Sequence, residues 1–260
     1  MNANLNYFAE ERQASIKNYI DDNKHVTVLE LSNHFGVSLS TIRNDLTLLE
    51  NKGLIHRTHG GAISVNSIRV NDETIPSLRR IINTDVKDEI AYLANSQVKD
   101  GDTIGIMAGT TTFAFAKTLA NKEDLTIITS DLLIATWLDE NTDHSIYMLS
   151  GFIRPKFQFV IPESASLEGI NLDKIFFSGS GFDLKKGATV SDLNMAIGMR
   201  SIIQKATTAI FMCDSSKLGI VSFARTVGLE DIDVFITDNG INEMYRNEIS
   251  SQEHITLLTN

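Results

Sequence analysis

The chain has 260 residues, of which 42% are hydrophobic and 22% charged, enough for one large domain or two smaller ones. This composition excludes a collagen-like, low-complexity or wholly disordered chain. A single cysteine excludes an intrachain disulfide and the usual Cys/His zinc frameworks. No apolar run approaches the ~18 residues of a membrane span, so we expect a cytoplasmic protein without a membrane partner.

The net charge of −10 is unevenly distributed along the chain. Residues 1–65 contain six Lys and Arg against seven Asp and Glu, which gives −1 and leaves −9 for residues 66–260. Such a difference favours two domains with different partners. We predict a first domain over 1–65, a linker rich in Ser, Asn and Asp over 66–76, and a second domain over 77–260.

The first region is predicted to contain three short helices. Apolar residues spaced at i, i+3 and i+4 mark helices over about 9–22 and 28–35. Gly36 suits the end of the second helix because it tolerates positive φ, and Ser38 can cap the third. Two short strands follow, at Leu54–Thr58 and Ala62–Val65.

Helix, helix, tight turn, helix and hairpin is the order of a winged helix-turn-helix. If Ile42, Leu46 and Leu49 are buried, the polar side chains of the third helix must face outward. Arg binds guanine or phosphate, Asn pairs with adenine, and Ser or Thr bonds phosphate. The residues predicted to contact double-stranded DNA are Ser38, Ser40, Thr41, Arg43, Asn44 and Thr47, with Arg57 and His59 on the wing. A small helical dimerisation unit is the alternative.

The second region is predicted to be an α/β domain with a mostly parallel sheet, because strand-like and helical segments alternate. The strand candidates are Thr103–Met107, Leu125–Thr129, Ile146–Leu149, Lys174–Phe177, Thr208–Met212, Val234–Thr237 and Ile255–Leu258. The helix candidates are Thr112–Leu119, Leu132–Leu138, Met195–Ala206 and Ile241–Ile249. Ligands on such sheets bind beyond the carboxyl ends of the strands.

Polar loops follow three of the predicted strands and should converge at one edge of the sheet. A helix start after a glycine favours anions, and a lysine can neutralise a phosphate. The predicted effector site consists of Gly109, Thr110, Thr111, Thr112, Ser180, Gly181, Asp183 and Lys217. A small phosphorylated polyol would fit these groups. The alternative is that each segment is an ordinary turn, with threonine capping the helix.

The sequence contains no evident catalytic or metal-binding set. No Ser/His/Asp or Cys/His arrangement is apparent, we expect no cofactor, and Cys213 ends an apolar run as a small buried hydrophobe would. A sugar-phosphate isomerase with an accessory domain is a rival interpretation. That enzyme would need a general base near the sugar, and Asp183 is the one tempting carboxylate.

The order of several motifs identifies a resemblance. Thr41–Leu46, His59–Ala62, Ser180–Asp183 and Asp214–Gly219 together resemble the DeoR family of bacterial transcriptional regulators, and the resemblance covers nearly the full chain. It implies a repressor of a carbohydrate operon, with a sensor domain similar to sugar-phosphate isomerases and CoA transferases. It also implies a phosphorylated sugar as effector and a homo-oligomer, a dimer or tetramer, on paired half-sites.

The chain departs from the family pattern at several positions. Asn44 stands where the family usually has Arg. In the sensor, Met107, Ser130, Phe152 and Met195 replace the usual Asp, Asn, Gly and Glu. The loss of carboxylates from the expected pocket favours an altered ligand, because the threonine loop and the lysine remain. A sensor that serves only for oligomerisation, in a regulator that binds no ligand, is the alternative.

Overall fold

The structure, a computed structural model, describes residues 9–23, 25–51, 54–58, 60–64, 83–154, 157–163 and 168–260. Contacts divide the chain into two units, Met1–Ile82 and Asn83–Asn260, and each is described by itself. The predicted linker over 66–76 and the wing residue His59 lie outside the described residues. No helix in the described ranges is long and apolar enough to cross a membrane.

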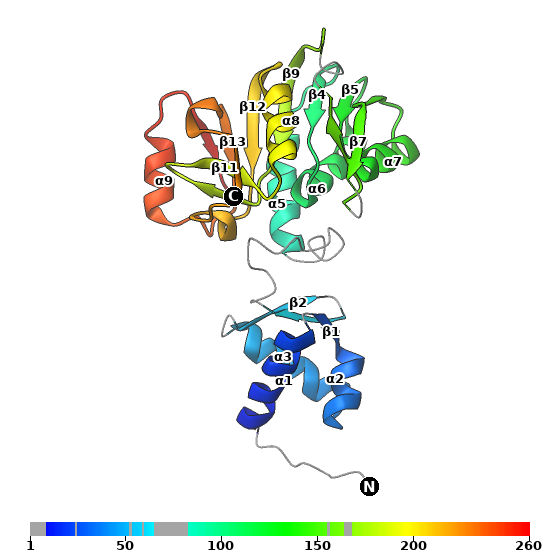
Figure 1. The fold of residues 1–260 in the computed structure, drawn as a ribbon, viewed down its shortest axis with the longest axis vertical. Coiled ribbons are helices and arrows are strands. Elements are labelled where there is room, and N and C mark those ends of the chain that lie inside the picture. Colours follow the sequence, from blue (N-terminus) through cyan, green and yellow to red (C-terminus); the bar gives the residue numbers. More distant parts are fainter. Residues whose placement is uncertain are drawn as a thin grey trace. The chain divides into compact units, whose positions relative to one another are not determined.

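The described residues of the first unit form three helices and a small antiparallel sheet (Figure 1). The helices are α1 (Ala9–Asn23), α2 (Val28–Phe35) and α3 (Leu39–Asn51). The strands are β1 (His25–Thr27), β2 (Ile55–Thr58) and β3 (Gly61–Ser64), in the order β1-β3-β2. The sequence analysis anticipated every one of these elements except β1. The arrangement is a helix-turn-helix followed by a β-hairpin wing.

Local sequence explains why this unit turns where it does. Gly36 ends α2 with φ of 66°, a left-handed conformation that glycine adopts without strain. Gly61 lets β3 approach β1, since a Cβ there would lie 1.9 Å from the carbonyl oxygen of Val26. The predicted stripe of α3 packs into the core with α1 and α2, where Ile16 and Leu31 are fully buried.

The second unit contains the predicted parallel sheet. Seven strands lie in the order β15-β14-β12-β9-β4-β5-β6, and every neighbouring pair is parallel. Their bounds are β4 (Thr103–Ile106), β5 (Thr126–Thr129), β6 (Ser145–Met148), β9 (Leu172–Phe177), β12 (Ala206–Met212), β14 (Val234–Ile236) and β15 (Thr256–Leu258). The fold class is therefore α/β, as the alternation of elements predicted.

Both faces of this sheet are covered. Phe176 and Phe177 are neighbours on β9 but belong to different core clusters, because successive strand residues point to opposite faces. One face packs against α5 (Thr84–Asn95), α6 (Thr110–Thr118) and α7 (Leu132–Asn141). The other packs against α8 (Leu193–Ile203) and α9 (Glu243–Ser250). Short 3-10 turns complete the unit at η2 (Leu119–Asn121), η4 (Ser215–Lys217) and η5 (Leu229–Asp231).

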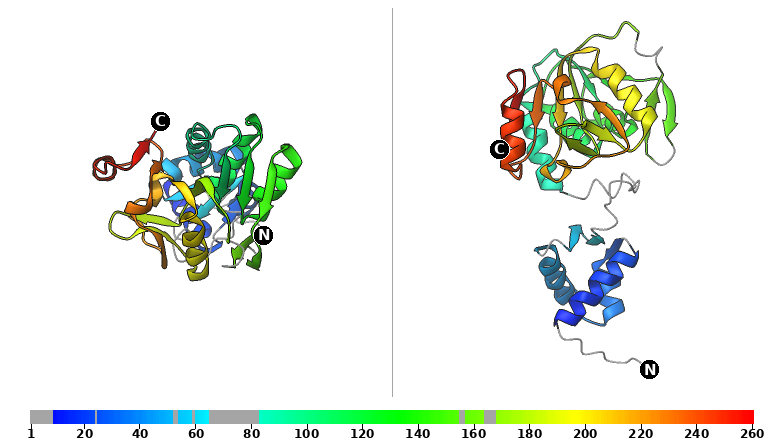
Figure 2. Two further views of the ribbon diagram at one scale, coloured as in Figure 1. Left: turned by 90° about the horizontal axis from the view of Figure 1, so that it is seen from above. Right: turned by 60° about the vertical axis from the view of Figure 1, so that its left-hand side comes forward.

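Two smaller antiparallel sheets were not predicted. One contains β10 (Gly181–Asp183), β11 (Gly187–Val190) and β13 (Ala224–Val227). The other is a two-stranded ribbon of β7 (Gly151–Arg154) and β8 (Phe159–Pro162) (Figure 1, Figure 2). The prediction that Ser180, Gly181 and Asp183 lie in a polar loop was wrong for Gly181 and Asp183, because residues 181–183 pair with β11.

Candidate nucleic-acid interface and effector site

The third helix separates apolar from polar side chains as predicted. Ile42, Leu46 and Leu49 are at most 2% exposed and pack into the core of the first unit. The polar residues that lie exposed on the other side of α3 are Ser40, Arg43, Asn44 and Thr47, with Thr41 half-buried. This outward face, which we call the α3 face, carries hydrogen-bonding groups suited to base edges and phosphates.

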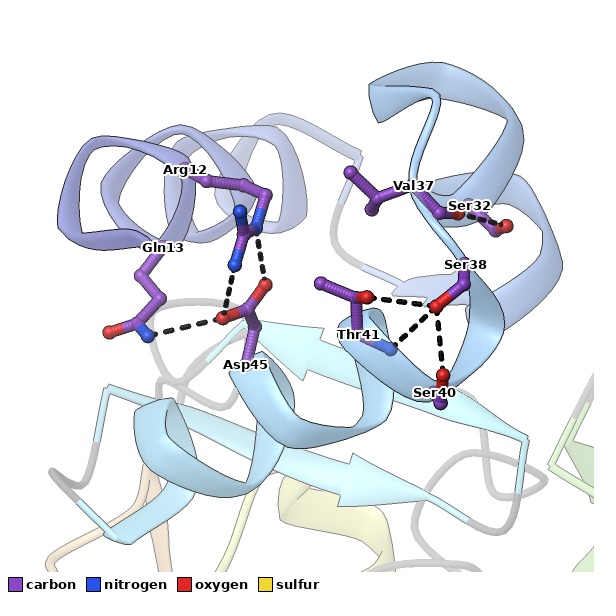
Figure 3. Close-up of polar contacts among 8 residues, drawn as sticks. All are labelled: Arg12, Gln13, Ser32, Val37, Ser38, Ser40, Thr41 and Asp45. Carbon is purple, nitrogen blue, oxygen red and sulfur yellow. Dashed lines mark hydrogen bonds and ion pairs between the residues drawn. The ribbon is translucent and has the colours of Figure 1, made fainter. Parts of the chain in front are cut away.

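A hydroxyl cluster opens the α3 face. Ser38 caps the helix, since its Oγ accepts a hydrogen bond from the backbone N–H of Thr41 at 3.2 Å. The same oxygen lies 2.8 Å from Ser40 Oγ and 2.8 Å from Thr41 Oγ1 (Figure 3). Ser38 and Ser40 are exposed, so the start of α3 combines hydroxyls with the positive end of a helix dipole. Phosphate oxygens are favoured at such a place.

A buried carboxylate fixes α3 against α1. Asp45 accepts hydrogen bonds from Arg12 Nε at 2.6 Å, from Arg12 Nη2 at 3.2 Å and from Gln13 Nε2 at 3.1 Å (Figure 3). Its hydrogen bond raises the pKa of Arg12, which keeps the guanidinium charged. The sequence analysis missed these three residues. The signal was present, because Asp45 lies on the same side of α3 as Ile42 and Leu49, where a carboxylate needs a partner.

Arg57, on the wing, forms a hydrogen bond with α3. Its Nη1 donates to Thr47 Oγ1 at 2.9 Å, and Thr47 Oγ1 donates to the carbonyl of Arg43 at 2.8 Å. The backbone N–H of Arg57 donates to Glu50 at 3.0 Å. Its Nε is buried and has no hydrogen-bond partner in the structure. The structure therefore gives Arg57 a contact within the first unit, and its contact with DNA stays a prediction.

The loops of the predicted effector site meet at one edge of the large sheet. Gly109 follows β4, residues 178–180 follow β9, and η4 with Lys217 follows β12. The strands lie side by side in the order β12-β9-β4, so their carboxyl ends bring the loops together. This convergence is the one that the sequence analysis expected.

The segment from Gly109 to Thr112, which we call the threonine loop, contains an internal hydrogen bond. Gly109 precedes α6, and the hydroxyl of Thr112 donates to its carbonyl oxygen at 3.0 Å. Thr112 is fully buried, Thr111 is 4% exposed, and Thr110 is half-buried. Of the three hydroxyls, that of Thr110 is the most accessible to a ligand, whereas Thr112 shapes the turn.

Other predicted effector residues form hydrogen bonds or close packing contacts within the second unit. Asp183 accepts hydrogen bonds from the backbone N–H groups of Lys185 and Lys186, both at 2.9 Å, and so shapes the turn between β10 and β11. Gly181 allows close packing, since a Cβ there would lie 2.4 Å from the carbonyl oxygen of Ile220. Ser180 is half-buried beside them.

The Lys217 ammonium is the cation of the predicted effector site. Among the described residues no carboxylate is bridged to it, and its side chain is half-buried. Asp214 instead caps η4 by accepting from the backbone N–H of Ser216 at 3.2 Å. Across the described part of the chain no cluster of His, Cys, Asp and Glu could hold a metal ion.

A small pocket lies at the carboxyl ends of β4 and β5. Its lining is Met107, Ala108, Ser130, Phe159, Val160, Pro162, Met195 and Met199. Seven of these eight side chains are apolar. Three of the four sensor positions that depart from the family pattern therefore line one pocket, and the fourth, Phe152, lies on β7 and does not belong to the lining.

Two family models match most of the chain. A family model described as a DeoR-like helix-turn-helix domain matches residues 12–68, and one described as the DeoR C-terminal sensor domain matches residues 82–239. A partial structural likeness exists to ribose 5-phosphate isomerase from Plasmodium falciparum, with 17% identity over 52% of each chain and a TM-score of 0.39.

Several curated relatives match over most of both chains. The HTH-type transcriptional regulator GolR of Listeria innocua is 35% identical over 91% of this chain and 93% of its own. GlpR of Haloferax volcanii is 32% identical over 93% and 94%, and the transcriptional repressor AccR of Agrobacterium fabrum is 32% identical over 89% and 90%. The chain is a regulator and not an enzyme, and it belongs to the DeoR family of DNA-binding transcriptional regulators.

Proposed function

We propose that this regulator represses a carbohydrate-use operon by placing the α3 face in the major groove of operator DNA. The observation that carries the proposal is the division of α3, with Arg43 and Asn44 exposed and Leu46 in the core. Arg43 would donate to guanine or phosphate and Asn44 would pair with adenine. The Agrobacterium relative is named a transcriptional repressor, and this supports repression rather than activation by the present protein.

The remaining DNA contacts belong to the hydroxyls at the start of the helix. Ser38, Ser40 and Thr41 would bond backbone phosphates and fix the register of α3 on the duplex. Thr47 would face the groove and is held in place by Arg57. His59, which lies outside the described residues, would contact the DNA backbone.

A phosphorylated ligand at the carboxyl edge of the sheet would release the DNA. The start of α6 after Gly109, the exposed part of Thr110 and the charge of Lys217 supply the anion-binding groups. In the neighbouring pocket, Ser130 is the one lining side chain that could form a hydrogen bond with a hydroxyl group of the ligand. It therefore favours an effector with fewer hydroxyls than an ordinary sugar phosphate, since apolar walls leave hydroxyl groups unpaired.

The active form in the cytoplasm would be a homo-oligomer, a dimer or tetramer. One recognition helix reads a single half-site, and paired half-sites require at least two copies. Binding of ligand and of DNA would then be linked through the assembly.

Selection of bound sequences from random double-stranded DNA, with the full chain, tests the proposal. We expect one enriched motif with two half-sites, and weaker retention when a panel of sugar phosphates is added. Lys217→Ala should keep the motif and lose the response to the active compound. A library without enrichment would overturn the DNA-binding assignment.

A regulator that binds no ligand is the second candidate, and the apolar lining of the pocket favours it. Thermal unfolding separates the two. A compound that binds only the native state raises its stability by RT ln(1 + [L]/Kd). A shift in melting temperature with a member of the panel supports the effector, and no shift with any of them supports the second candidate.

A further inference from the structure

Large apolar side chains are exposed on three segments of the second unit. Phe152 is 72% exposed, Phe223 is 75% exposed, and four aliphatic residues nearby are at least half exposed. The six residues are Phe152 and Ile153 on β7, Leu193 and Ile197 on α8, and Val221 and Phe223 before β13. We call this set the β7–α8 patch.

Specific contacts hold β7 beside α8. Arg154 at the end of β7 forms an ion pair with Asp192, the residue that caps α8, with Nε and Oδ2 3.7 Å apart. Strand β8 packs directly on α8, since a Cβ at Gly198 would lie 2.7 Å from Pro162 Cδ. The ion pair also neutralises the charges between the two elements.

The segment of the patch before β13, which contains Val221 and Phe223, lies next to the start of α8. Ala224 pairs with Val190 on β11, two residues before the cap of α8, and Ser222 donates to Thr189 at 2.8 Å. Phe223 stands between these two anchored residues. The six side chains therefore lie on three segments that neighbour one another in the second unit.

The strand β7 has an open edge within the described residues. It pairs with β8 alone, and both Phe152 and Ile153 are exposed although they point to opposite sides of the strand. An exposed apolar edge strand is a template for pairing with another chain, and soluble proteins normally cover or charge such an edge. A two-stranded ribbon by itself is also only marginally stable in water.

The size of the patch suits a second copy of this chain. Two phenylalanines and four aliphatic side chains exposed to this degree offer on the order of 500 Å² of apolar surface. A standard interface buries ~800 Å² per partner, and homodimer interfaces are ~65% apolar. The patch thus supplies the apolar share that one partner of a stable dimer needs.

We propose that the β7–α8 patch is the face through which two copies of this chain associate, in an interface with two-fold symmetry. The same patch on each copy then covers the other, which closes the assembly and leaves no apolar surface to continue a fibre. This inference rests on the proposed function, because an operator with paired half-sites requires two recognition helices in one particle.

Molar mass in solution tests the proposal without DNA or ligand. The full chain should measure as a dimer, or as an assembly of dimers, at micromolar concentration. Phe152→Glu and Ile197→Glu each place charge in the patch and should at least halve that mass. Met244→Glu is the matched control, since Met244 is 58% exposed on α9, on the opposite side of the unit from β7 (Figure 1, Figure 2). It should leave the mass unchanged.

Amide hydrogen exchange of the unmodified chain provides a second test that does not depend on any variant folding. Amides of 151–154 and 193–197 should exchange more slowly at high protein concentration than at low concentration. A monomeric unmodified chain, patch variants of unchanged mass, or exchange independent of concentration would each overturn the interface. Failure of the DNA selection with a dimeric protein would instead overturn the proposed function alone.

Discussion

Arg43 offers a direct test of base reading by the α3 face. It is exposed, and its carbonyl oxygen accepts a hydrogen bond from Thr47 Oγ1, so its backbone is fixed while its side chain is available to DNA. Arg43→Ala should weaken specific operator binding by about 1–3 kcal/mol. Arg43→Lys is the informative companion, because lysine keeps the charge and loses the bidentate geometry.

Gel shifts at matched salt, with operator and with scrambled DNA, provide the measurement. The lysine variant should retain binding to scrambled DNA and lose preference for the operator. An alanine variant with unchanged operator affinity would remove Arg43 from the interface.

Thr47 and Arg57 should be energetically coupled in their effect on operator binding. Thr47→Val removes the acceptor of the Arg57 guanidinium, whose Nε already lacks a partner. Thr47→Val and Arg57→Ala should each weaken operator binding, and their effects should be non-additive, with a coupling of about 0.5–3 kcal/mol. A double-mutant cycle of operator affinity measures the coupling.

The salt dependence distinguishes this positioning role from a phosphate contact. Loss of one phosphate contact lowers the slope of log K against log salt by about 1. We expect Arg57→Ala to leave the slope unchanged. Additive losses together with a reduced slope would show that Arg57 binds the duplex directly.

At the scale of elements, the ion pair between Arg12 on α1 and Asp45 on α3 should stabilise the packing of α3 against α1. Asp45→Ala leaves Arg12 and Gln13 without their acceptor in a largely buried site. We expect a loss of about 2–3 kcal/mol of stability in the first unit, since breaking such a pair strands a charge. Hydrogen exchange of α1 and α3 amides measures it.

The control for that experiment is Asp22→Ala, on the exposed side of α1. It should leave exchange in both helices unchanged. Equal protection in the Asp45 variant and the unmodified chain would show that apolar packing alone holds α3.

The start of α2 carries a pH-dependent cap. Glu30 accepts from the backbone N–H of Thr27 at 2.6 Å, and this bond, with one from the Thr27 hydroxyl, lowers the pKa of Glu30. A lowered folded-state pKa gives stability that is present above the ordinary glutamate pKa and lost as pH falls through the folded value. Glu30→Ala should therefore destabilise α2 at pH 7 and have little effect in acid.

Thermal unfolding of the two proteins across this pH range provides the measurement. The gap between their melting temperatures should narrow as pH decreases. A gap that stays constant from neutral to acidic pH would show that the Glu30 charge does not contribute.

At the scale of the whole molecule, Cys213 reports on the integrity of the large sheet. It follows β12, is 1% exposed, and burial raises the pKa of its thiol well above the ordinary value. Since the thiolate is the reactive form, the native protein should not react with a thiol reagent within minutes. One thiol should react at once after unfolding in denaturant, and fast reaction of the native chain would contradict the burial.

The sequence determined the parts of this protein that depend on local periodicity. The spacing of Ile42, Leu46 and Leu49 oriented α3, and Gly36 ended α2, because helix period and backbone freedom act within a few residues. The parallel strands were predictable for the same reason, since fully buried strands appear as short continuous apolar runs. The meeting of the predicted effector loops at one edge of the sheet followed from chain order alone.

The tertiary structure decided everything that joins distant segments. The pairing of Asp45 with Arg12, the tether from Arg57 to Thr47, and the apolar pocket that contains Met107 and Met199 each link residues far apart in the chain. Strands such as β7 and β10 are too short for a period of their own, and they exist because a neighbouring strand completes their hydrogen bonds. Burial and partners are properties of the packed fold, so the sequence limited these features without specifying them.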